Sequence, residues 1–324
     1  MNTGLSLRKI SYYLPKIVQT NVQLKKMHPE WEVDKVQKKT GIFQRYIARD
    51  DETSLDLGLC ASKSLFKEYK VKPIEIDALL FISQSPDYVL PPSSCILQEK
   101  LCMRNDILAL DINLGCSGFV NSLALASSLL KSNEINNCLI ICAETYSKYI
   151  NSNDRTNKMI FSDASSACIV EKDNSDSYIG NFSFGCDGTG SKELIVEGSG
   201  ARGNLERDQQ KLYMNGPAIL LFTLSQVPKL INKTLKKNGL SLKDIDLFIF
   251  HQASKLVLEL LCEKIGIEKH KTYTNLELKG NTVSCSIPIA LKDAFLEKKL
   301  IPGNKVLIIG FGVGYSLGST IISW

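Results

Sequence analysis

Apolar runs of strand length alternate with amphipathic segments along most of the chain. The predicted strands span residues 76–84, 106–114, 138–144, 166–171, 245–252, 305–312 and 318–323. The predicted helices cover about residues 52–69, 117–131, 217–236, 255–265 and 287–298. Buried strands that alternate with helices are typical of an α/β protein.

The pattern also repeats itself. IDALLFISQS at residues 76–85 matches IDLFIFHQAS at residues 245–254, an offset of 169 positions. NNCLIICAET at residues 136–145 matches GNKVLIIGFG at residues 303–312, an offset of 167. Two matches at nearly the same offset predict a duplicated α/β unit, with halves at residues 1–171 and 172–324 related by a pseudo-twofold axis. Loops from both halves would meet near that axis, where a site can draw residues from each.

Composition indicates an ordinary globular protein. The 324 residues are 44% apolar and 23% charged, and the net charge is +5. These values exclude a disordered or fibrous chain. The lysines are spread along the whole sequence, so a solvated surface is favoured over binding to nucleic acid.

The N-terminal stretch MNTGLSLRKISYYLPKIV has no continuous apolar region and no small-residue cleavage site, so it does not read as a signal peptide. No apolar run reaches the roughly 18 residues that span a bilayer. We therefore expect a cytoplasmic protein without membrane association, whose ten cysteines are reduced and mostly in the core. Cys138 and Cys142 in CLIIC lack a second pair, which favours a buried strand over a zinc site, and no metal is expected.

One cysteine stands apart. In LDINLGCSGF a strand-like run ends at Gly115. Cys116 follows directly, and the predicted helical segment SGFVNSLALASSLLK begins after it. A thiol is a useful nucleophile only as a thiolate, and the free N–H groups of a helix N-terminus would stabilise one there. The alternative is a core cysteine at a tight turn. A serine-hydrolase elbow is excluded because Ser117 lacks the G-x-S-x-G frame.

Candidate partners for Cys116 lie in the second half. His28 and His270 stand in polar stretches, whereas His251 ends the apolar strand IDLFIF, at the junction that the repeat predicts. It is a candidate base or hydrogen-bond donor, although a histidine at a strand end is often structural. Asn281 in LKGNT precedes a helix. An asparagine there is usually a cap, but its amide can also donate to a developing oxyanion.

The glycine-rich loop GFGVGYSLGS at residues 310–319 is not a dinucleotide loop, because only one further strand follows it. Together with LGCSGF, FHQAS and KGNT, in that order, it resembles the β-ketoacyl-[acyl-carrier-protein] synthase III family of the thiolase superfamily. KTGIFQRYIARDDET and FSDASSACIVE resemble two further signatures of that family. The resemblance extends over essentially the whole chain.

The resemblance implies a thiolase-like fold in layered α-β-α-β-α arrangement, a homodimer, and no cofactor. It implies that Cys116 accepts an acyl group from acyl-CoA or an acyl carrier protein. His251 and Asn281 would then hold the carbonyl of malonyl carrier protein while loss of CO₂ generates an enolate that attacks acyl-Cys116. Backbone N–H groups of Cys116 and near Val313 would hold the tetrahedral oxyanion.

Several positions depart from the family pattern. Val313 replaces the central glycine of the final loop, and Ser254 replaces an asparagine after the histidine. At the substrate entrance, Lys35 stands where the family has an adenine-stacking tryptophan and Pro217 where it has an asparagine, while Arg155 is retained. These departures put recognition of CoA in doubt and leave open whether the acyl group arrives on CoA or on a carrier protein.

The acyl pocket and the carrier-docking face are also altered. Leu90 in PDYVLPPSS stands at a dimer-contacting turn where the family often has an aromatic residue, and its smaller side chain leaves room for a longer or branched primer. Lys255 and Lys264 remain as candidate docking residues on the helix after His251, whereas the usual arginine is Leu256. Both lysines are equally compatible with a solvated surface.

Other functions remain open at this point. A non-decarboxylating thiolase would need a second cysteine in the final glycine loop, which has none. An acyltransferase or a cysteine thioester hydrolase of the same fold, acting in secondary metabolism, is the main alternative. A non-catalytic binding protein is the remaining one. The primer and the pathway are not predicted.

Overall fold

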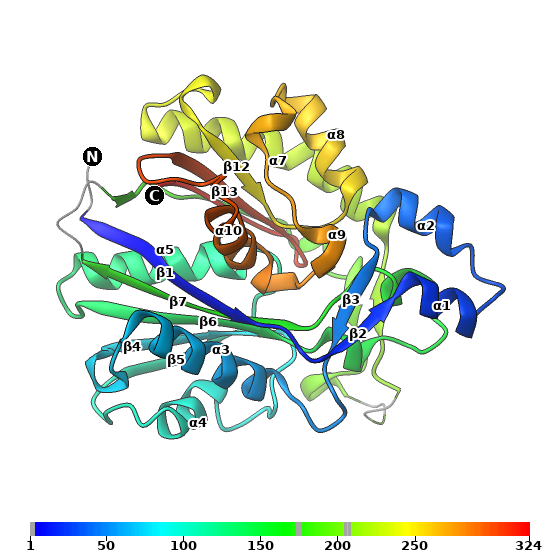
Figure 1. The fold of residues 1–324 in the computed structure, drawn as a ribbon, viewed down its shortest axis with the longest axis horizontal. Helices are drawn as coiled ribbons and strands as arrows, with labels where there is room; N and C mark the ends of the chain where they lie inside the picture. The colour runs from blue at the N-terminus through cyan, green and yellow to red at the C-terminus, as the bar shows by residue number, and fades with distance from the viewer. Residues whose placement is uncertain (1–3, 173–176, 204–205, 207–208) are drawn as a thin grey trace.

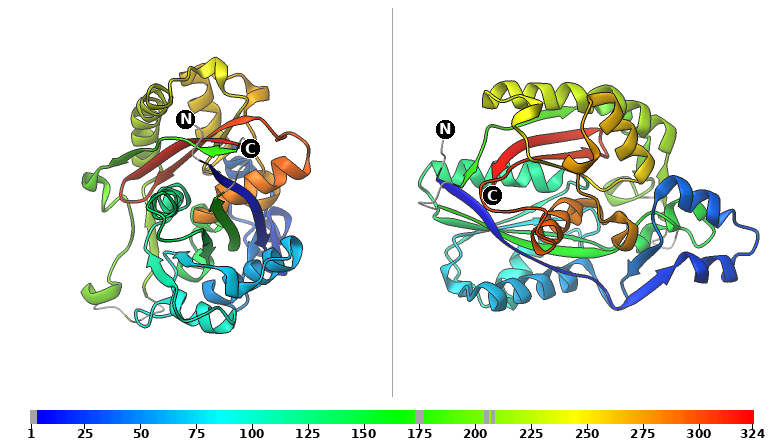
Figure 2. Two further views of the ribbon diagram at one scale, coloured as in Figure 1. Left: turned by 90° about the vertical axis from the view of Figure 1, so that its left-hand side faces the viewer. Right: turned by 45° about the horizontal axis from the view of Figure 1, so that its top comes forward.

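The computed structural model describes residues 4–172, 177–203, 206 and 209–324. Two five-stranded sheets lie face to face, with helices between them and on both outer sides (Figure 1). The two turned views show the same succession of layers (Figure 2). The arrangement is therefore the α-β-α-β-α layering that the sequence predicted.

The first sheet has the strand order β1-β7-β6-β4-β5. Its strands are β1 (Leu5–Tyr13), β4 (Ala78–Ile82), β5 (Leu108–Ile112), β6 (Asn137–Glu144) and β7 (Ala164–Lys172). β4 pairs in parallel with both β5 and β6, and β7 runs antiparallel to β6 and β1. Its outer face carries α3 (Ser54–Tyr69) and α4 (Ser93–Lys100).

The second sheet has the order β12-β13-β14-β8, and β9 also pairs with β14. Its strands are β8 (Tyr178–Ile179), β9 (Ser183–Cys186), β12 (Leu247–Phe250), β13 (Lys305–Gly312) and β14 (Ser316–Ser323). α7 (Gly216–Asn238) and α8 (Lys255–Ile265) form the outer layer. α5 (Gly118–Lys131) and α10 (Ser286–Leu296) lie between the two sheets.

Smaller elements surround this framework. They are β2 (Ile17–Thr20), α1 (Asn21–Met27), α2 (Val33–Thr40), β3 (Gln44–Ile47), α6 (Arg155–Lys158), β10 (Leu194–Val196), β11 (Leu212–Met214) and α9 (Leu276–Lys279). Short 3₁₀ helices span Pro73–Glu75, Tyr146–Tyr149, Gly188–Gly190, Gly200–Arg202, Leu242–Asp244, Lys269–Lys271 and Val283–Cys285.

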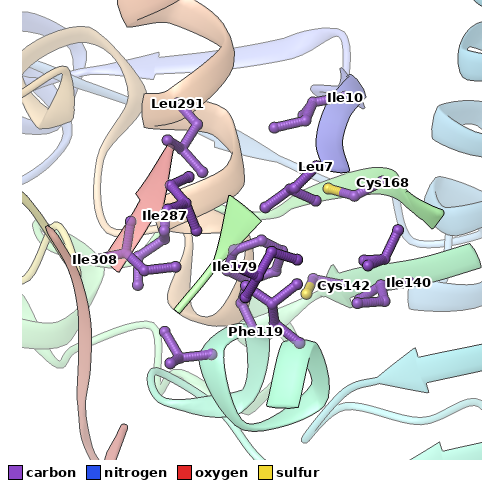
Figure 3. Packing of buried hydrophobic residues seen from close by; sticks show 14 of the residues in the cluster. Leu7, Ile10, Phe119, Ile140, Cys142, Cys168, Ile179, Ile287, Leu291 and Ile308 are labelled. Carbon is purple, nitrogen blue, oxygen red and sulfur yellow. The ribbon is translucent and has the colours of Figure 1, made fainter. Parts of the chain in front are cut away.

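Each central strand is buried on both faces, because successive side chains point to opposite sides of a sheet. In β4, Leu80 and Ile82 pack toward the helices between the sheets, whereas Leu79 and Phe81 pack toward α3 and α4. Figure 3 shows the middle layer, where Phe119 of α5 and Leu291 of α10 join residues of both sheets. This packing fixes both sheets against the same two helices.

The repeat appears as matching strand arrangements. β4 pairs in parallel with β6, which is antiparallel to β7, and β12 pairs in parallel with β13, which is antiparallel to β14. The predicted boundary between residues 171 and 172 falls at the end of β7 and stays a prediction.

Every strand and helix predicted from the sequence is present, with ends that differ by a few residues. The elements that were not predicted are β1 to β3, β8 to β11, α1, α2, α4, α6, α9 and the short 3₁₀ helices. β1 reads LSLRKISYY, in which charged residues interrupt the apolar pattern because the strand lies at the edge of its sheet. No helix within the described ranges is both long and apolar enough to cross a membrane.

All ten cysteines are free thiols. Cys138 and Cys142 are buried in β6, as the strand interpretation of CLIIC predicted. The expectation of a mostly buried set is only half correct, because Cys95, Cys102 and Cys186 are exposed.

Candidate functional site

Polar loops gather where the central strands end. Cys116 follows β5, His251 follows β12 directly, and Val313 follows β13. Because neighbouring parallel strands end at the same edge of a sheet, the loops within each half meet at one edge. The middle helices α5 and α10 begin close behind Cys116 and Asn281, so residues distant in sequence can form one site.

The turn that carries Cys116 lies directly against β13. A Cβ atom placed on Gly312 would lie 2.9 Å from Cys116 Sγ, and one on Gly310 would lie 2.7 Å from the Cα atom of Ser117. Glycine at both positions is therefore what permits this approach. The backbone N–H groups of Cys116 and Val313 both hydrogen-bond the sulfur, so the predicted oxyanion donors stand on the same side as the nucleophile.

A chain of hydrogen bonds holds the Val313 peptide. Asn121 Nδ2 donates to Ser117 Oγ at 3.3 Å, Ser117 Oγ lies 2.6 Å from Ser316 Oγ, and Ser316 Oγ donates to the Val313 carbonyl at 2.8 Å. These bonds link the Cys116 turn to the β13–β14 turn. Ser117, Asn121 and Ser316 were not predicted as site residues, because a serine or asparagine in such a segment carries no distinctive sequence signal.

The same β13–β14 turn is anchored from outside. Tyr315 exchanges two backbone hydrogen bonds with Asp187, of 2.7 and 3.0 Å. Its ring stacks on Phe222 of α7 with 4.0 Å between centroids. The turn that presents the Val313 N–H is thus held on both sides.

His251 is buried, and its ring is oriented by Ser286. Nδ1 lies 2.7 Å from Ser286 Oγ, so Nε2 is the ring nitrogen that remains for a ligand. Burial lowers the pKa of His251 to about 3, and a hydrogen bond to the Val283 carbonyl opposes this only in part. The imidazole is therefore neutral at physiological pH.

Asn281 is oriented by its own loop. Its Oδ1 accepts the Val283 N–H at 2.9 Å, which leaves the Nδ2 amide as the free donor end of the side chain. Its backbone is fixed by bonds to Ile160 and Ser162, both of 2.9 Å. Gly280 precedes it with a φ of 71°, where a Cβ would lie 2.8 Å from Ser162 Cβ. The amide therefore projects from a rigid loop.

Val283 contacts all three predicted groups. Its N–H binds Asn281, its carbonyl faces the His251 ring, and its side chain packs in the apolar cluster that contains Cys116. Its φ of 53° is left-handed, which is unusual for a β-branched residue and is typically maintained where surrounding contacts enforce it. Val283 was not predicted, because a valine in an apolar segment reads as core.

The expected stabilisation of a Cys116 thiolate by the start of a helix stays a prediction, because burial opposes it in the substrate-free site. α5 begins at Gly118, after a cap residue. Burial, and to a smaller extent the nearby Glu144 carboxylate, raise the pKa of Cys116 to about 12. The N–H groups of Cys116 and Val313 lower the pKa, but the cost of desolvation is larger. The resting site therefore holds a neutral thiol beside a neutral imidazole.

Apolar side chains surround the sulfur. The cluster contains Tyr146, Phe161, Leu194, Leu212 and Val283 together with Cys116, and half-buried residues including Val196, Met214 and Ile219 pack against it. Leu194, Val196, Leu212 and Met214 come from the paired strands β10 and β11. The surroundings of Cys116 suit an apolar substrate portion better than a charged one.

The entrance residues lie on neighbouring elements. Arg155 is exposed at the start of α6, and Lys35 is exposed on α2, where it pairs with Glu32 at 3.2 Å. Met159, just after α6, packs against Trp31 before α2. Trp31 is only 9% exposed, and the ring of His28 stacks on it with 3.9 Å between centroids. That indole is therefore not an open stacking surface beside Arg155.

The remaining predicted residues lie on α8 or outside the apolar cluster around Cys116. Ser254 caps α8 by accepting the Val257 N–H at 3.4 Å, which gives it a structural role. Lys255 and Lys264 are both exposed, but nine positions on a helix place them on opposite sides of α8. Leu90 is 79% exposed and does not belong to the cluster around Cys116.

No cluster of three or more His, Cys, Asp or Glu side chains suited to a metal ion occurs among the residues that the structure describes. The predicted groups at the site are a thiol, an imidazole, an amide and backbone N–H groups.

Comparison with known proteins gives consistent matches. The family described as 3-oxoacyl-[acyl-carrier-protein (ACP)] synthase III matches residues 110–188, and the family for the C-terminal part of that enzyme matches residues 235–324. The first segment contains Cys116, and the second contains His251 and Asn281.

Full-length relatives agree. The chain is 33% identical over 320 residues to the beta-ketoacyl-[acyl-carrier-protein] synthase III of Caldanaerobacter subterraneus subsp. tengcongensis, covering 96% of this chain and 95% of that protein. A crystal structure of a 3-oxoacyl-(acyl-carrier-protein) synthase III superimposes with a TM-score of 0.95 at 35% identity and 99% coverage of both chains. The Burkholderia xenovorans LB400 structure of a 3-oxoacyl-(acyl-carrier protein) synthase gives 0.93 at 31% identity, covering 99% and 94%. These likenesses confirm the predicted fold.

The raised pKa of Cys116 predicts how its reactivity depends on pH. Alkylation of Cys116 by iodoacetamide should accelerate steadily from pH 6 to pH 9 without a plateau, because the thiolate fraction keeps growing below a pKa of about 12. Peptide mapping separates Cys116 from the nine other cysteines, and Cys116→Ser confirms the assignment. An alkylation rate that levels off near pH 7 would indicate a pKa of Cys116 below 7 and would contradict the structure.

The close approach of β13 to Cys116 predicts a strong effect of Gly312→Ala. The new methyl group would lie 2.9 Å from Cys116 Sγ, so it should displace the sulfur or the Val313 N–H. We expect the alkylation rate of Cys116 to change at least about tenfold at fixed pH. A misplacement of about 1 Å can change a rate by about 10²-fold, so this effect is well within reach. Gly188→Ala is the matched control, because nothing lies within 4 Å of its added Cβ. Equal rates for both variants would contradict the packing.

Proposed function

The chain belongs to the 3-oxoacyl-[acyl-carrier-protein] synthase III family, and on that premise we propose that it performs acyl transfer followed by decarboxylative condensation. An acyl thioester would load Cys116. Malonyl carried on acyl carrier protein would then enter, lose CO₂ and attack the acyl group. The products would be a β-ketoacyl carrier protein, CO₂ and the free enzyme.

In the loading step, Cys116 Sγ attacks the thioester carbonyl and the carrier thiol leaves with the proton of Cys116. The tetrahedral oxyanion that forms between these two events would accept hydrogen bonds from the N–H groups of Cys116 and Val313, which already face the sulfur. Each such preorganised donor is typically worth about 10²- to 10³-fold in rate. The raised pKa of Cys116 keeps the resting thiol protonated, so it does not react with other electrophiles before the substrate is bound.

In the condensing step, Asn281 Nδ2 and His251 Nε2 would donate to the malonyl thioester oxygen. The carboxyl C–C bond breaks, CO₂ leaves, and its electron pair forms the enolate. The enolate carbon attacks the carbonyl of acyl-Cys116, the C–S bond breaks, and the sulfur takes up one proton from solvent. Neutral His251 would donate in the tautomer in which Ser286 donates to Nδ1 and Nε2 carries the ring proton, with the thioester oxygen replacing the Val283 carbonyl as the acceptor of the ring N–H.

One observation carries this proposal: the amide of Asn281 can only donate toward the site, because Val283 occupies its oxygen. Thioester hydrolysis needs one oxyanion site, which the N–H groups of Cys116 and Val313 would supply, so the further donors Asn281 and His251 favour a reaction with a second oxyanion. The relatives reported above are named as synthases, which favours condensation over simple acyl transfer or thioester hydrolysis.

The primer and its carrier form a finer part of the proposal. Lys35 offers no stacking surface and Trp31 is buried beneath His28. These two facts support an acyl group delivered on carrier protein rather than on CoA. Docking through Lys255 and Lys264 together is not favoured, because they lie on opposite sides of α8. Lys255 also pairs with Glu259 at 3.8 Å.

The predicted homodimer is part of the same proposal. Tyr88, Val89 and Leu90 are 59%, 92% and 79% exposed, which leaves an apolar turn on the surface of the single chain. A partner subunit would cover such a turn. The cytoplasmic location and the absence of a cofactor also stay predictions.

The two half-reactions should respond differently to mutation. Cys116→Ala should form no acyl adduct with any thioester, whereas Asn281→Ala should load normally and condense at least about 10²-fold more slowly, the typical effect of losing one oxyanion donor. Intact-protein mass spectrometry with a panel of acyl-CoA and acyl-carrier thioesters, before and after malonyl carrier protein is added, measures both steps. Condensation by Asn281→Ala at the wild-type rate would remove the enolate role of Asn281.

The exposed turn should set primer size if a partner covers it. Leu90→Phe should shorten the longest acyl chain that loads Cys116, because the larger ring would fill part of the neighbouring pocket. The control is Leu221→Phe, at a residue that is 71% exposed on α7. An unchanged chain-length profile in Leu90→Phe would exclude the turn from the pocket.

A further inference from the structure

Glu144 is a fully buried carboxyl group beside the site that the condensation steps do not use. It ends β6 and is 0% exposed. Its Oε2 accepts the Gln84 N–H at 3.1 Å and the Ser85 hydroxyl at 3.0 Å, and its Oε1 accepts the Ser284 hydroxyl at 2.8 Å. It forms no ion pair within the ranges that the structure describes. A carboxyl held by neutral donors alone is costly to bury, so its presence calls for an explanation.

The oxygen pair of Glu144 joins two segments that belong to opposite halves of the chain. On the Oε2 side, the Gln84 side chain lies directly beneath the turn that carries Cys116. A side chain on Gly115 would overlap Gln84 Oε1, and Tyr146 donates to that same oxygen at 2.6 Å. The position of the Cys116 turn thus depends on Gln84.

On the Oε1 side, Ser284 directly follows Val283. Val283 is the residue whose N–H orients Asn281 and whose carbonyl faces His251. Because its φ of 53° is unfavourable for valine, the peptide needs a restraint to keep this conformation. The bond from Ser284 to Glu144 is such a restraint, one residue away.

We propose that Glu144 is a positioning residue for the condensing step, which couples the Cys116 turn to the segment that orients Asn281 and His251. The carboxyl group of Glu144 hydrogen-bonds both segments. Its two oxygens therefore set the distance between the sulfur that carries the acyl group and the donors that bind the enolate. The inference rests on the proposed function, because it assigns a role within that reaction.

The charge of Glu144 gives a second, independent signature. The titratable groups that face it are Cys116 at its turn, Cys142 on β6, Tyr146 after β6 and Cys285 before α10. Burial raises the pKa of Glu144 to about 8. Below that pH the carboxyl is mostly neutral, and above it a negative charge forms that opposes ionisation of Cys116. Removing the carboxyl should therefore increase thiolate formation mainly above pH 8.

Three variants separate these roles. Ser284→Ala removes one hydrogen bond and keeps the carboxyl, Glu144→Gln removes the charge and keeps the shape, and Glu144→Ala removes both. Glu171→Gln is the matched control, on the neighbouring strand β7 where the carboxylate pairs with Lys9 at the surface. Each purified variant is measured for acyl loading, for condensation with malonyl carrier protein, and for the pH dependence of Cys116 alkylation.

We expect Ser284→Ala and Glu144→Ala to load at nearly the wild-type rate and to condense about 10- to 100-fold more slowly. A misplacement of the reacting groups by about 1 Å causes a rate loss of this size. Glu144→Gln should condense at least about tenfold faster than Glu144→Ala, because its amide retains an acceptor for Gln84 and a donor for Ser284. Cys116 in Glu144→Gln should also be alkylated about 3- to 10-fold faster than in wild type above pH 8 and at the wild-type rate at pH 6. The faster rate corresponds to a decrease in the pKa of Cys116 of up to about one unit.

Equal losses of loading and condensation in Ser284→Ala and Glu144→Ala would overturn the proposal and leave Glu144 a purely structural residue. So would an alkylation profile of Glu144→Gln that coincides with that of wild type. A wild-type protein that neither loads nor condenses would instead contradict the proposed function. In that case the alkylation profile still tests the coupling between Glu144 and Cys116.

Discussion

The approach of β13 to the Cys116 turn is the contact on which the site depends. It is made where the two halves meet, and it is possible only because Gly310 and Gly312 have no side chains. Once the strand lies there, the N–H that follows it faces the sulfur and the serine pair links the two turns. The middle helices cannot move to compensate, since both sheets pack on them at interior density. A catalytic distance is thus set by backbone packing rather than by flexible side chains.

Burial determines the kind of chemistry that this contact can support. The thiol and the imidazole are both neutral because desolvation outweighs the groups that would favour their charged forms. A site of this kind stabilises charge as it develops, through N–H donors that are already oriented. Such donors act more strongly where water is excluded, and they require no reorganisation during the reaction. The apolar cluster around the sulfur therefore contributes to the electrostatics as well as to the binding of the acyl chain.

The sequence was sufficient for the framework and for the chemically distinctive residues. Both sheets followed from apolar runs, the duplication followed from two matching segments, and Cys116, His251 and Asn281 stood at strand or helix ends with recognisable neighbours. Val283 and Glu144 could not be found in this way. The role of Val283 lies in its backbone angle, and that of Glu144 lies in hydrogen bonds to residues 60 and 140 positions away.

Electrostatic expectations were the weakest part of the prediction. A helix start after Cys116 was visible in the sequence, but the degree of burial was not, and burial decides the sign of the pKa shift. Lys255 and Lys264 were both candidates for carrier docking, although the helical period places them on opposite sides of α8.

The left-handed Val283 peptide also limits how this protein could be made more stable. An asparagine or glycine would fit its backbone angle with less strain, and strain of this kind costs about 1–3 kcal/mol. Either replacement would remove the buried side chain that packs beside Cys116. The site therefore keeps a strained backbone at Val283. A replacement that stabilises this loop would also lower the activity. Directed evolution for heat resistance would be expected to gain elsewhere and leave this position unchanged.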